Sequence, residues 1–570
     1  IKGTYRRNSI TSKTIVGSII ANAGNINNIE ATFENNTSEA TGGIISGGII
    51  FNSTNKNIDK INATVKDNHI SSSVGINGGI LLNQGTIGTI DGNYEKNIIS
   101  GVERVQGGII SLINSKITNI KGVYKDNSAT STIVTGGIIY NSGTIDNIEA
   151  TFENNTSEST GDNAWGGVIF NGTGKTIGTI NSTFKNNSLN TSKTAFGGVI
   201  QNQGTITSIT GSFEGNSTYQ GGAINNSTNG LITTINADFI GNSANVGTAI
   251  SNLGRIDSIA GNFTNNIGAT VIYNTGTIGD ITADFTGNYS LKDEVGGSCL
   301  SSFNGNVGNI TGNFTGNYQD FSSNADSETW GGILYFRAGD TSGVENPTET
   351  TIYTIGKISG EFTGNYTLAG TINGSGLHFR AVNSTVFQTV AEGVDGTFTG
   401  NYGVASKGAA KGGVLFNEAS ATYSTVKTIT GTYKNNYLSG KTSALGGVLF
   451  NNSANTTSHA IITKLTGTFT DNYVTSEGSA YGGVIYNTGT MEDVSGTYKN
   501  NYAVSTGGTA LGGAIYTKTD MTITSGENGT TFSGNYVSTD GGTTKDYQAI
   551  YVADASKTLT LNSTNNGSIT

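Results

Sequence analysis

The residues of this sequence that are best suited to catalysis are two aspartates. Asp238 and Asp284 occupy the same position of a repeated segment, two repeats apart. If the repeats stack as strands, their carboxyl groups lie about 9–10 Å apart, near the upper limit for an inverting pair of glycosidase carboxylates. However, Asn262 occupies the same position in the repeat between them, and no Lys, Arg or His accompanies the pair. We therefore predict no catalytic residues.

Metal, cofactor and nucleophile chemistry also lack a convincing set of residues. The histidines His69, His378 and His459 share no metal-ligand spacing, and we expect the last two to face solvent in or beside long loops. Cys299 follows Gly-Gly-Ser on an apolar run, which is typical of a small core residue. Residues 172–176 end like a phosphate-binding loop, but Ile169 replaces its first glycine. We predict no metal and no cofactor.

A repeated segment spans the whole chain and must position all of these side chains. It carries apolar, small and aromatic residues at alternate positions and Asn three residues after the aromatic one, as in Ile281-Thr-Ala-Asp-Phe-Thr-Gly-Asn288. Eighteen copies occur from Tyr5 to Phe532, with Val65 replacing the aromatic residue once. Their mean period of about 31 residues is typical of solenoids.

The alternation within each copy has the period of a half-buried strand, with the apolar, small and aromatic residues facing inward. A second stretch, such as Gly136-Gly-Ile-Ile-Tyr-Asn141, has paired glycines that indicate a sharp bend and an Asn that suits a turn. A third short piece, such as Thr144-Ile145, brings each repeat to about three strands and three corners. These features predict an all-β fold, a right-handed parallel β-helix of about 18 coils and roughly 85 Å in length.

Equivalent residues of successive coils should stack into columns, including ladders of Asn amides. The structural ladder residues are Phe33, Asn36, Phe152, Asn155, Phe213, Asn216, Phe285, Asn288, Phe469 and Asn472. From the eleventh copy onward, the residue after the repeat Asn is always Tyr, which adds a second aromatic column. This column either packs a corner or binds sugars, and its candidate binding residues are Tyr366, Tyr402, Tyr437 and Tyr473.

The repeats predict a single β-helix over residues 1–570. Residues 1–290 hold regular and short coils, residues 318–465 hold coils with long loop insertions, and residues 466–570 hold regular coils and a terminal coil. The loops are predicted at 319–329, 337–351, 376–392, 418–426 and 453–459. Either these loops carry a binding face, as loops on rigid scaffolds often do, or their length variation is neutral.

The composition excludes several classes of protein. Only 12% of the residues are charged and the net charge is −10, which disfavours nucleic acid as a partner because its binding depends on Lys and Arg. A single cysteine precludes an internal disulfide framework. No apolar run is long enough for membrane insertion, and the absence of a signal peptide and initiating Met suggests part of a longer protein. The abundance of Asn, Thr and Ser favours an extracellular location.

Paired-glycine motifs and Phe-x-x-Asn motifs alternate along nearly the whole chain. Examples are Gly221-Gly-Ala-Ile224 with Phe239-Ile-Gly-Asn242, and Gly512-Gly-Ala-Ile515 with Phe532-Ser-Gly-Asn535. In this alternation the sequence resembles the passenger region of the chlamydial-type polymorphic outer membrane proteins, a branch of the autotransporters. The resemblance implies a secreted β-helix displayed on a bacterial outer membrane, often serving adhesion. The chain differs in having mostly Val or Ile after the glycine pair and almost no cysteine.

Three hypotheses for function follow. The first is a non-enzymatic extracellular surface protein, an adhesin-like passenger that forms a rigid rod and binds glycans or proteins of host or neighbouring cells. The second is a structural fibre subunit that associates end to end with further copies, because exposed strand edges invite pairing. The third is a polysaccharide-degrading β-helix enzyme, the least favoured because no catalytic constellation is found.

Overall fold

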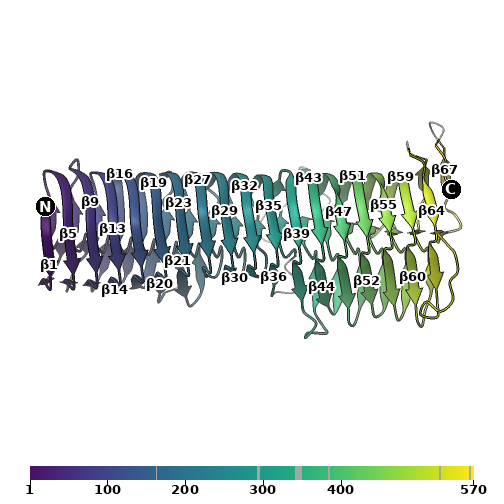
Figure 1. Ribbon diagram of the computed structural model, residues 1–570, viewed down its shortest axis with the longest axis horizontal. Coiled ribbons are helices and arrows are strands. Elements are labelled where there is room, and N and C mark those ends of the chain that lie inside the picture. Colours follow the sequence, from purple (N-terminus) through teal and green to yellow (C-terminus); the bar gives the residue numbers. More distant parts are fainter. Residues whose placement is uncertain are drawn as a thin grey trace. The chain divides into compact units, whose positions relative to one another are not determined.

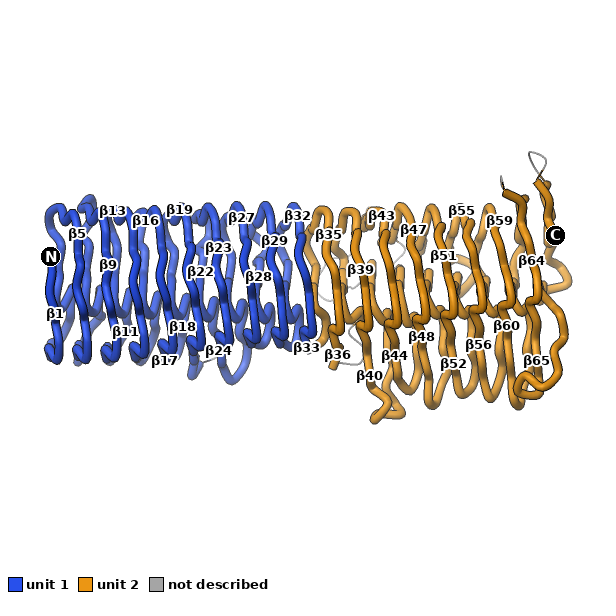
Figure 2. Tube along the Cα trace, viewed as in Figure 1, with its two compact units in different colours: residues 1–268 blue, residues 269–570 orange. Residues whose placement is uncertain are grey.

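The chain folds as two compact units built almost wholly of strands. The computed structural model describes residues 1–161, 163–291, 296–339, 350–382, 386–420, 422–525, 528–563 and 567–570, and these contain no helix. Unit 1 comprises residues 1–268 and unit 2 residues 269–570, shown in blue and orange in Figure 2. Each unit is a stack of coils whose equivalent strands pair in parallel (Figure 1). The predicted all-β, parallel β-helix fold is therefore confirmed.

One coil of unit 1 consists of four strands. They are β5 (Asn25–Glu34), β6 (Thr37–Ala40), β7 (Ile45–Ser46) and β8 (Ile50–Asn52). The next coil repeats them as β9 (Asn57–Lys66), β10 (His69–Ser72), β11 (Gly75–Asn77) and β12 (Leu81–Asn83), each parallel to its predecessor. Ile29 pairs with Ile61 and Phe33 with Val65. Residues at the same position of the repeat therefore lie above one another.

The prediction of three strands per coil is wrong in two respects. The short piece Thr144-Ile145 is not a separate strand, because it continues into the core segment within β19 (Ile139–Glu153). In addition, two strands such as β6 and β7 lie between the repeat Asn and the paired glycines. Their inward residues are often small, like the buried Ser38 and Ala40. Side chains of this kind produce a weak hydrophobic pattern.

The alternating segment faces the interior as predicted. In β35 (Thr277–Thr286), Ile281, Ala283 and Phe285 are at most 5% exposed, whereas Thr282 is exposed. The aromatic residues stack from coil to coil, with ring centroids 4.8–5.0 Å apart between Phe152 and Phe263. Each inner ring is covered on both faces by the rings of the neighbouring coils, so the column forms a continuous part of the core.

The repeat Asn forms the predicted amide ladder, in which every polar atom of the amide is used. Oδ1 of Asn216 accepts hydrogen bonds from the backbone N–H (2.9 Å) and from Nδ2 (3.1 Å) of Asn187. Nδ2 of Asn216 donates to Oδ1 of Asn242 and to the carbonyl oxygen of Phe184, both at 3.0 Å. The predicted ladder residues are all at most 2% exposed, namely Phe33, Asn36, Phe152, Asn155, Phe213, Asn216, Phe285, Asn288, Phe469 and Asn472.

The Asn that ends most of the paired-glycine strands forms a second, interrupted ladder. Nδ2 of Asn141 donates to Oδ1 of Asn171 (2.8 Å), while Oδ1 of Asn141 accepts from the backbone N–H of Gly143 (3.0 Å). One side chain therefore joins neighbouring coils and closes its own turn, which accounts for the choice of Asn at this position.

Backbone conformation explains two further recurring residue choices. Gly136 opens its paired-glycine bend with φ of 62°, and a Cβ atom there would lie 2.2 Å from the carbonyl oxygen of Ile139. The residue before the ladder Asn is also left-handed, as in Asn35 (φ 54°) and Gly215 (φ 61°). Gly, Asn and Asp recur before the ladder Asn because they tolerate this conformation best.

Much of the predicted loop sequence in residues 318–465 forms strands, which corrects the loops predicted at 376–392 and 418–426. Five-residue strands replace the three-residue β8 and β12 of unit 1: β42 (Leu334–Ala338), β46 (Leu377–Ala381), β50 (Leu415–Ala419) and β54 (Leu449–Ser453). The strands after them are also longer: β43 (Thr351–Thr363), β47 (Phe387–Thr399), β51 (Tyr423–Lys434) and β55 (His459–Thr470). Connections remain at 321–327 and 454–458, and positions 340–349, 383–385 and 421 lie outside the described residues.

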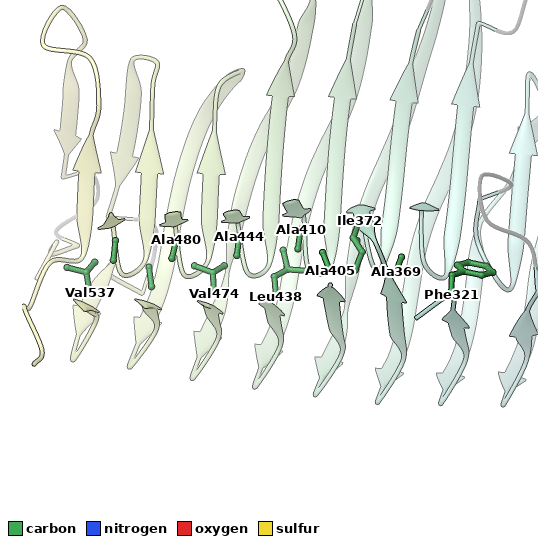
Figure 3. Packing of buried hydrophobic residues seen from close by; sticks show 12 residues of the cluster. Phe321, Ala369, Ile372, Ala405, Ala410, Leu438, Ala444, Val474, Ala480 and Val537 are labelled. Atoms are coloured by element: carbon green, nitrogen blue, oxygen red, sulfur yellow. The ribbon is translucent and has the colours of Figure 1, made fainter. Parts of the chain in front are cut away.

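The strands that follow the ladder Asn in unit 2 form one wall, called here the tyrosine strands. They are β36 (Tyr289–Ser290), β40 (Tyr318–Asp320), β44 (Tyr366–Ala369), β48 (Tyr402–Ala405), β52 (Tyr437–Gly440), β56 (Tyr473–Ser476), β60 (Tyr502–Ser505) and β65 (Tyr536–Ser538). Their inner side packs a buried cluster that includes Ile372, Leu438 and Val474 (Figure 3). This packing fixes the wall whose outer side is described next.

Candidate binding groove

A column of eight tyrosines lies on the outer side of the tyrosine strands. Each tyrosine is the first residue of its strand and is half-buried. Neighbouring rings stack with centroids 4.4–5.1 Å apart and planes within 16° of parallel. The members are Tyr289, Tyr318, Tyr366, Tyr402, Tyr437, Tyr473, Tyr502 and Tyr536.

The stacking decides what this column can offer to a ligand. A sugar that stacks on an aromatic side chain needs an open ring face. The candidate binding residues Tyr366, Tyr402, Tyr437 and Tyr473 each lie between two neighbouring rings, so both of their faces are covered. Burial raises the pKa of Tyr366, Tyr437 and Tyr473, which keeps these phenols protonated. The four tyrosines therefore pack through their faces and can present only ring edges and hydroxyl groups.

A groove of about 460 Å³ lies beside the column and crosses four coils. Its floor includes Val404, Ser439, Thr475 and Val504, each two residues after the tyrosine of β48, β52, β56 or β60. Side chains two residues apart on a strand point to the same side of the sheet. The tyrosine column therefore lies on the same side of the wall as the groove, although none of its tyrosines lines the groove.

One edge of the groove consists of residues that follow the same strands. Ser406, Lys441, Glu477 and Thr506 line it. Lys441 and Glu477 form an ion pair in which both side chains are at least half exposed. Such exposed pairs contribute little to stability, so either group can exchange this contact for one with a ligand. The lining combines hydroxyl groups and short apolar side chains, and its two charges cancel.

The two aspartates considered for catalysis each accept a hydrogen bond from a neighbouring coil. Asp238, in unit 1, accepts a hydrogen bond from Nδ2 of Asn262 (2.8 Å). Asp284, in unit 2, accepts one from the backbone N–H of Asn313 (2.8 Å). Neither residue lines the groove. Among the described residues, no group of three or more His, Cys, Asp and Glu side chains is arranged to hold a metal ion.

The histidines and the cysteine have different environments. The prediction of a solvent-facing His378 is wrong, because the supposed loop contains β46 and buries this side chain completely. His459 begins β55, where it is half-buried and stacks on Tyr423 with ring centroids 4.6 Å apart. His69 is exposed at the start of β10. Cys299 is fully buried, and burial raises the pKa of its thiol, as expected for a core residue.

His378 belongs to a buried polar cluster that the sequence analysis missed. Its Nε2 lies 3.3 Å from Oε2 of Glu418, and Nε of Arg380 lies 2.9 Å from the same oxygen. Nη1 of Arg380 donates to the hydroxyl of Tyr335 (3.3 Å), and its guanidinium carbon lies 3.6 Å from the ring centroid of Trp330. The side chains of Arg380 and Glu418 are only 17% and 12% exposed, so nearly the whole cluster is withdrawn from solvent.

Burial determines the protonation of this cluster. It lowers the pKa of His378, whose imidazole is therefore neutral at neutral pH. Burial alone would raise the pKa of Glu418, but the neighbouring His378 and Arg380 hold that pKa below its usual value. A neutral imidazole beside a carboxylate could act as a base, yet His378 has no exposed surface at which a substrate could meet it.

Alignment of the repeats on the paired-glycine strand is the signal that could have revealed the cluster. It places Tyr335, His378 and Phe416 in one column. Arg337, Arg380 and Glu418 then fall in the next outward column, two residues later. A cluster of opposite charges on adjacent coils follows from that register.

The described part of the chain contains no helix with the length and apolar character needed to cross a membrane. Comparisons with protein-family models, with curated proteins and with solved structures found no match.

Proposed function

We propose that the chain is a non-enzymatic, adhesin-like surface protein whose unit 2 binds an extended glycan of a host or neighbouring cell. The observation that supports this most is the groove beside the tyrosine column, with similar lining on four adjacent coils. Three strand spacings cover about 14 Å, enough for a short stretch of a glycan chain lying along the coils. The resemblance to outer-membrane passenger regions supports display on a bacterial surface or secretion.

The lining favours an uncharged sugar chain as the ligand. The hydroxyl groups of Ser439 and Thr475 can both donate and accept hydrogen bonds, as sugar recognition requires. Val404 and Val504 offer apolar contacts to the C–H faces of a sugar. An acidic polymer would need an excess of Lys and Arg, which the groove lacks.

A glycan array probed with the purified chain tests the proposal. Ser439→Arg should fill the groove and raise the Kd for any bound glycan at least about tenfold, equivalent to about 1.4 kcal/mol. Ser100→Arg is the matched control, because Ser100 is the third residue of β14 (Ile98–Gly101) in unit 1, as Ser439 is of β52. Absence of glycan binding, or equal binding by both variants, would overturn the binding site. Release of new reducing ends from a bound glycan would overturn the non-enzymatic assignment.

A further inference from the structure

We propose that the tyrosine column is a site of oxidative cross-linking, at which neighbouring tyrosines couple to dityrosine and join adjacent coils of unit 2 covalently. All seven consecutive ring pairs are stacked, with centroids 4.4–5.1 Å apart. The strand register holds each pair in place, since Tyr402 pairs with Tyr366 on one side and with Tyr437 on the other. Such fixed proximity replaces a slow bimolecular encounter.

The chemistry requires an oxidant that accepts single electrons, and a haem peroxidase supplied with hydrogen peroxide provides one. The oxidant takes one electron from each of two tyrosines, and each phenol releases its proton. The two phenoxyl radicals then form a carbon–carbon bond between ring positions adjacent to the hydroxyl groups. The hydrogens on those carbons move to the oxygens and restore both aromatic rings. Overall, two hydrogen atoms leave the protein and one hydrogen peroxide becomes two water molecules.

Access to solvent distinguishes this column from the buried tyrosine pair of unit 1. Tyr94 and Tyr124 in unit 1 also stack, with centroids 4.7 Å apart and planes 5° from parallel. However, they are at most 2% exposed, so neither an oxidant nor a proton acceptor reaches them. The column tyrosines are half-buried and can lose both the electron and the proton. The buried pair therefore provides an internal control with the same ring geometry.

The cross-links would reinforce a chain that cannot use disulfides, since Cys299 is its only cysteine. A link between Tyr402 and Tyr437 would close a loop of 35 residues, the difference between the two residue numbers. By analogy with disulfides, such a link stabilises the fold mainly by restricting the unfolded chain. An oxidising environment, such as the one in which secreted proteins form disulfides, would favour the reaction.

The experiment exposes the purified chain, at a concentration low enough to keep it monomeric, to a haem peroxidase and hydrogen peroxide. The monomer fraction is isolated and examined by dityrosine fluorescence, intact mass and peptide mapping. We expect a mass loss of two hydrogens per link and linked peptides that join neighbouring column tyrosines. Tyr94 and Tyr124 should remain unlinked in the same digest.

A variant with alternate tyrosines replaced provides the control: Tyr318→Phe, Tyr402→Phe, Tyr473→Phe and Tyr536→Phe. Phe stacks at the same spacing in the core, for instance Phe239 on Phe263 at 4.8 Å, so the column should still pack. The remaining column tyrosines are then separated by one coil, and linked peptides that join column tyrosines should be lost from the monomer. Circular dichroism confirms that the variant is folded. An unlinked parent monomer, links confined to other tyrosines, or undiminished dityrosine in the variant would each overturn the proposal, whether or not the groove binds glycans.

Discussion

Removal of one amide from the Asn ladder tests how much the ladder stabilises the β-helix. In Asn216→Ala, the backbone N–H and Nδ2 of Asn187 lose their shared acceptor. The carbonyl oxygen of Phe184 loses the hydrogen bond that it accepts from Nδ2 of Asn216. Oδ1 of Asn242 keeps one bond, because the backbone N–H of residue 216 still donates to it. The substitution therefore leaves the backbone N–H of Asn187 without its acceptor and the carbonyl oxygen of Phe184 without its side-chain donor at a fully buried position, while Nδ2 of Asn187 keeps its bond to the carbonyl oxygen of Phe152.

The expected cost follows from the two groups that lose their partner. A buried polar group left unpaired costs about 1–3 kcal/mol, so Asn216→Ala should lower the free energy of unfolding by about 2–6 kcal/mol. The control is Asn236→Ala, which removes an exposed Asn from β29 (Leu231–Ile240) in the same unit. Exposed substitutions of this kind usually change stability by less than about 0.5 kcal/mol.

Guanidinium denaturation followed by circular dichroism gives the stability difference, and hydrogen exchange with mass spectrometry locates it. Because a coil contacts only its neighbours, exchange in Asn216→Ala should accelerate mainly in residues 184–242. Equal denaturation midpoints and equal exchange patterns for Asn216→Ala and Asn236→Ala would refute the role given to the ladder.

Asn216→Asp separates hydrogen bonding from shape. The new carboxyl group can still accept from Asn187, but its other oxygen would face the carbonyl oxygen of Phe184 and Oδ1 of Asn242, which are both acceptors. The ionised form is disfavoured there, so the pKa of this carboxyl is raised in the folded state. Its stability contribution is then lost as pH rises, and the variant should be more stable near about pH 4 than near about pH 7, relative to Asn236→Asp.

Three further predictions concern buried positions. Burial lowers the pKa of His378 below its ordinary 6.5, so the unfolded chain takes up the proton first and the folded state loses stability as the pH drops below about 6.5. His378→Phe should therefore flatten the acidic part of a plot of melting temperature against pH. An unchanged plot would contradict the buried, neutral state of His378. Gly136→Ala should lower the free energy of unfolding by at least about 2 kcal/mol in a denaturant titration, because the backbone there is left-handed and the new Cβ would clash with the carbonyl oxygen of Ile139. The control Gly24→Ala, whose Cβ would enter open space, should lower it by less than about 1 kcal/mol. Cys299 should react with a thiol reagent only as unit 2 unfolds, and rapid labelling of the native chain would show that its strand opens.

The parallel β-helix could be predicted from the sequence because every coil obeys the same local rules. Inward positions such as Phe285 are apolar, and Asn216 and Gly136 have requirements that few other residues meet. Eighteen repetitions of one pattern make each of these choices visible without knowledge of the neighbours. The stacking of equivalent residues then follows from the period, since parallel strands in register place like positions above one another.

Strand number and loop length could not be predicted as well. Small inward residues such as Ser38 and Ala40 contribute little hydrophobic pattern, so β6 and its equivalents remained hidden. The extra residues of the longer repeats were predicted to be loops because nothing local distinguishes an insertion from a longer strand. Pairing with equally long neighbours decides the matter, as it does for β42, β46 and β50.

The sequence by itself determined the period and the inward and outward faces, because these depend on residues close together in the chain. The period in turn predicted the Asn ladders, because like positions of successive coils stack. Only the tertiary structure decided which outward side chains meet, because their partners lie on other coils. His378 and Glu418 are 40 residues apart in sequence, yet the register and the bend of each coil bury them together. In the same way, the sequence placed Tyr437 in a column, but coil spacing and ring orientation decided that its faces are covered.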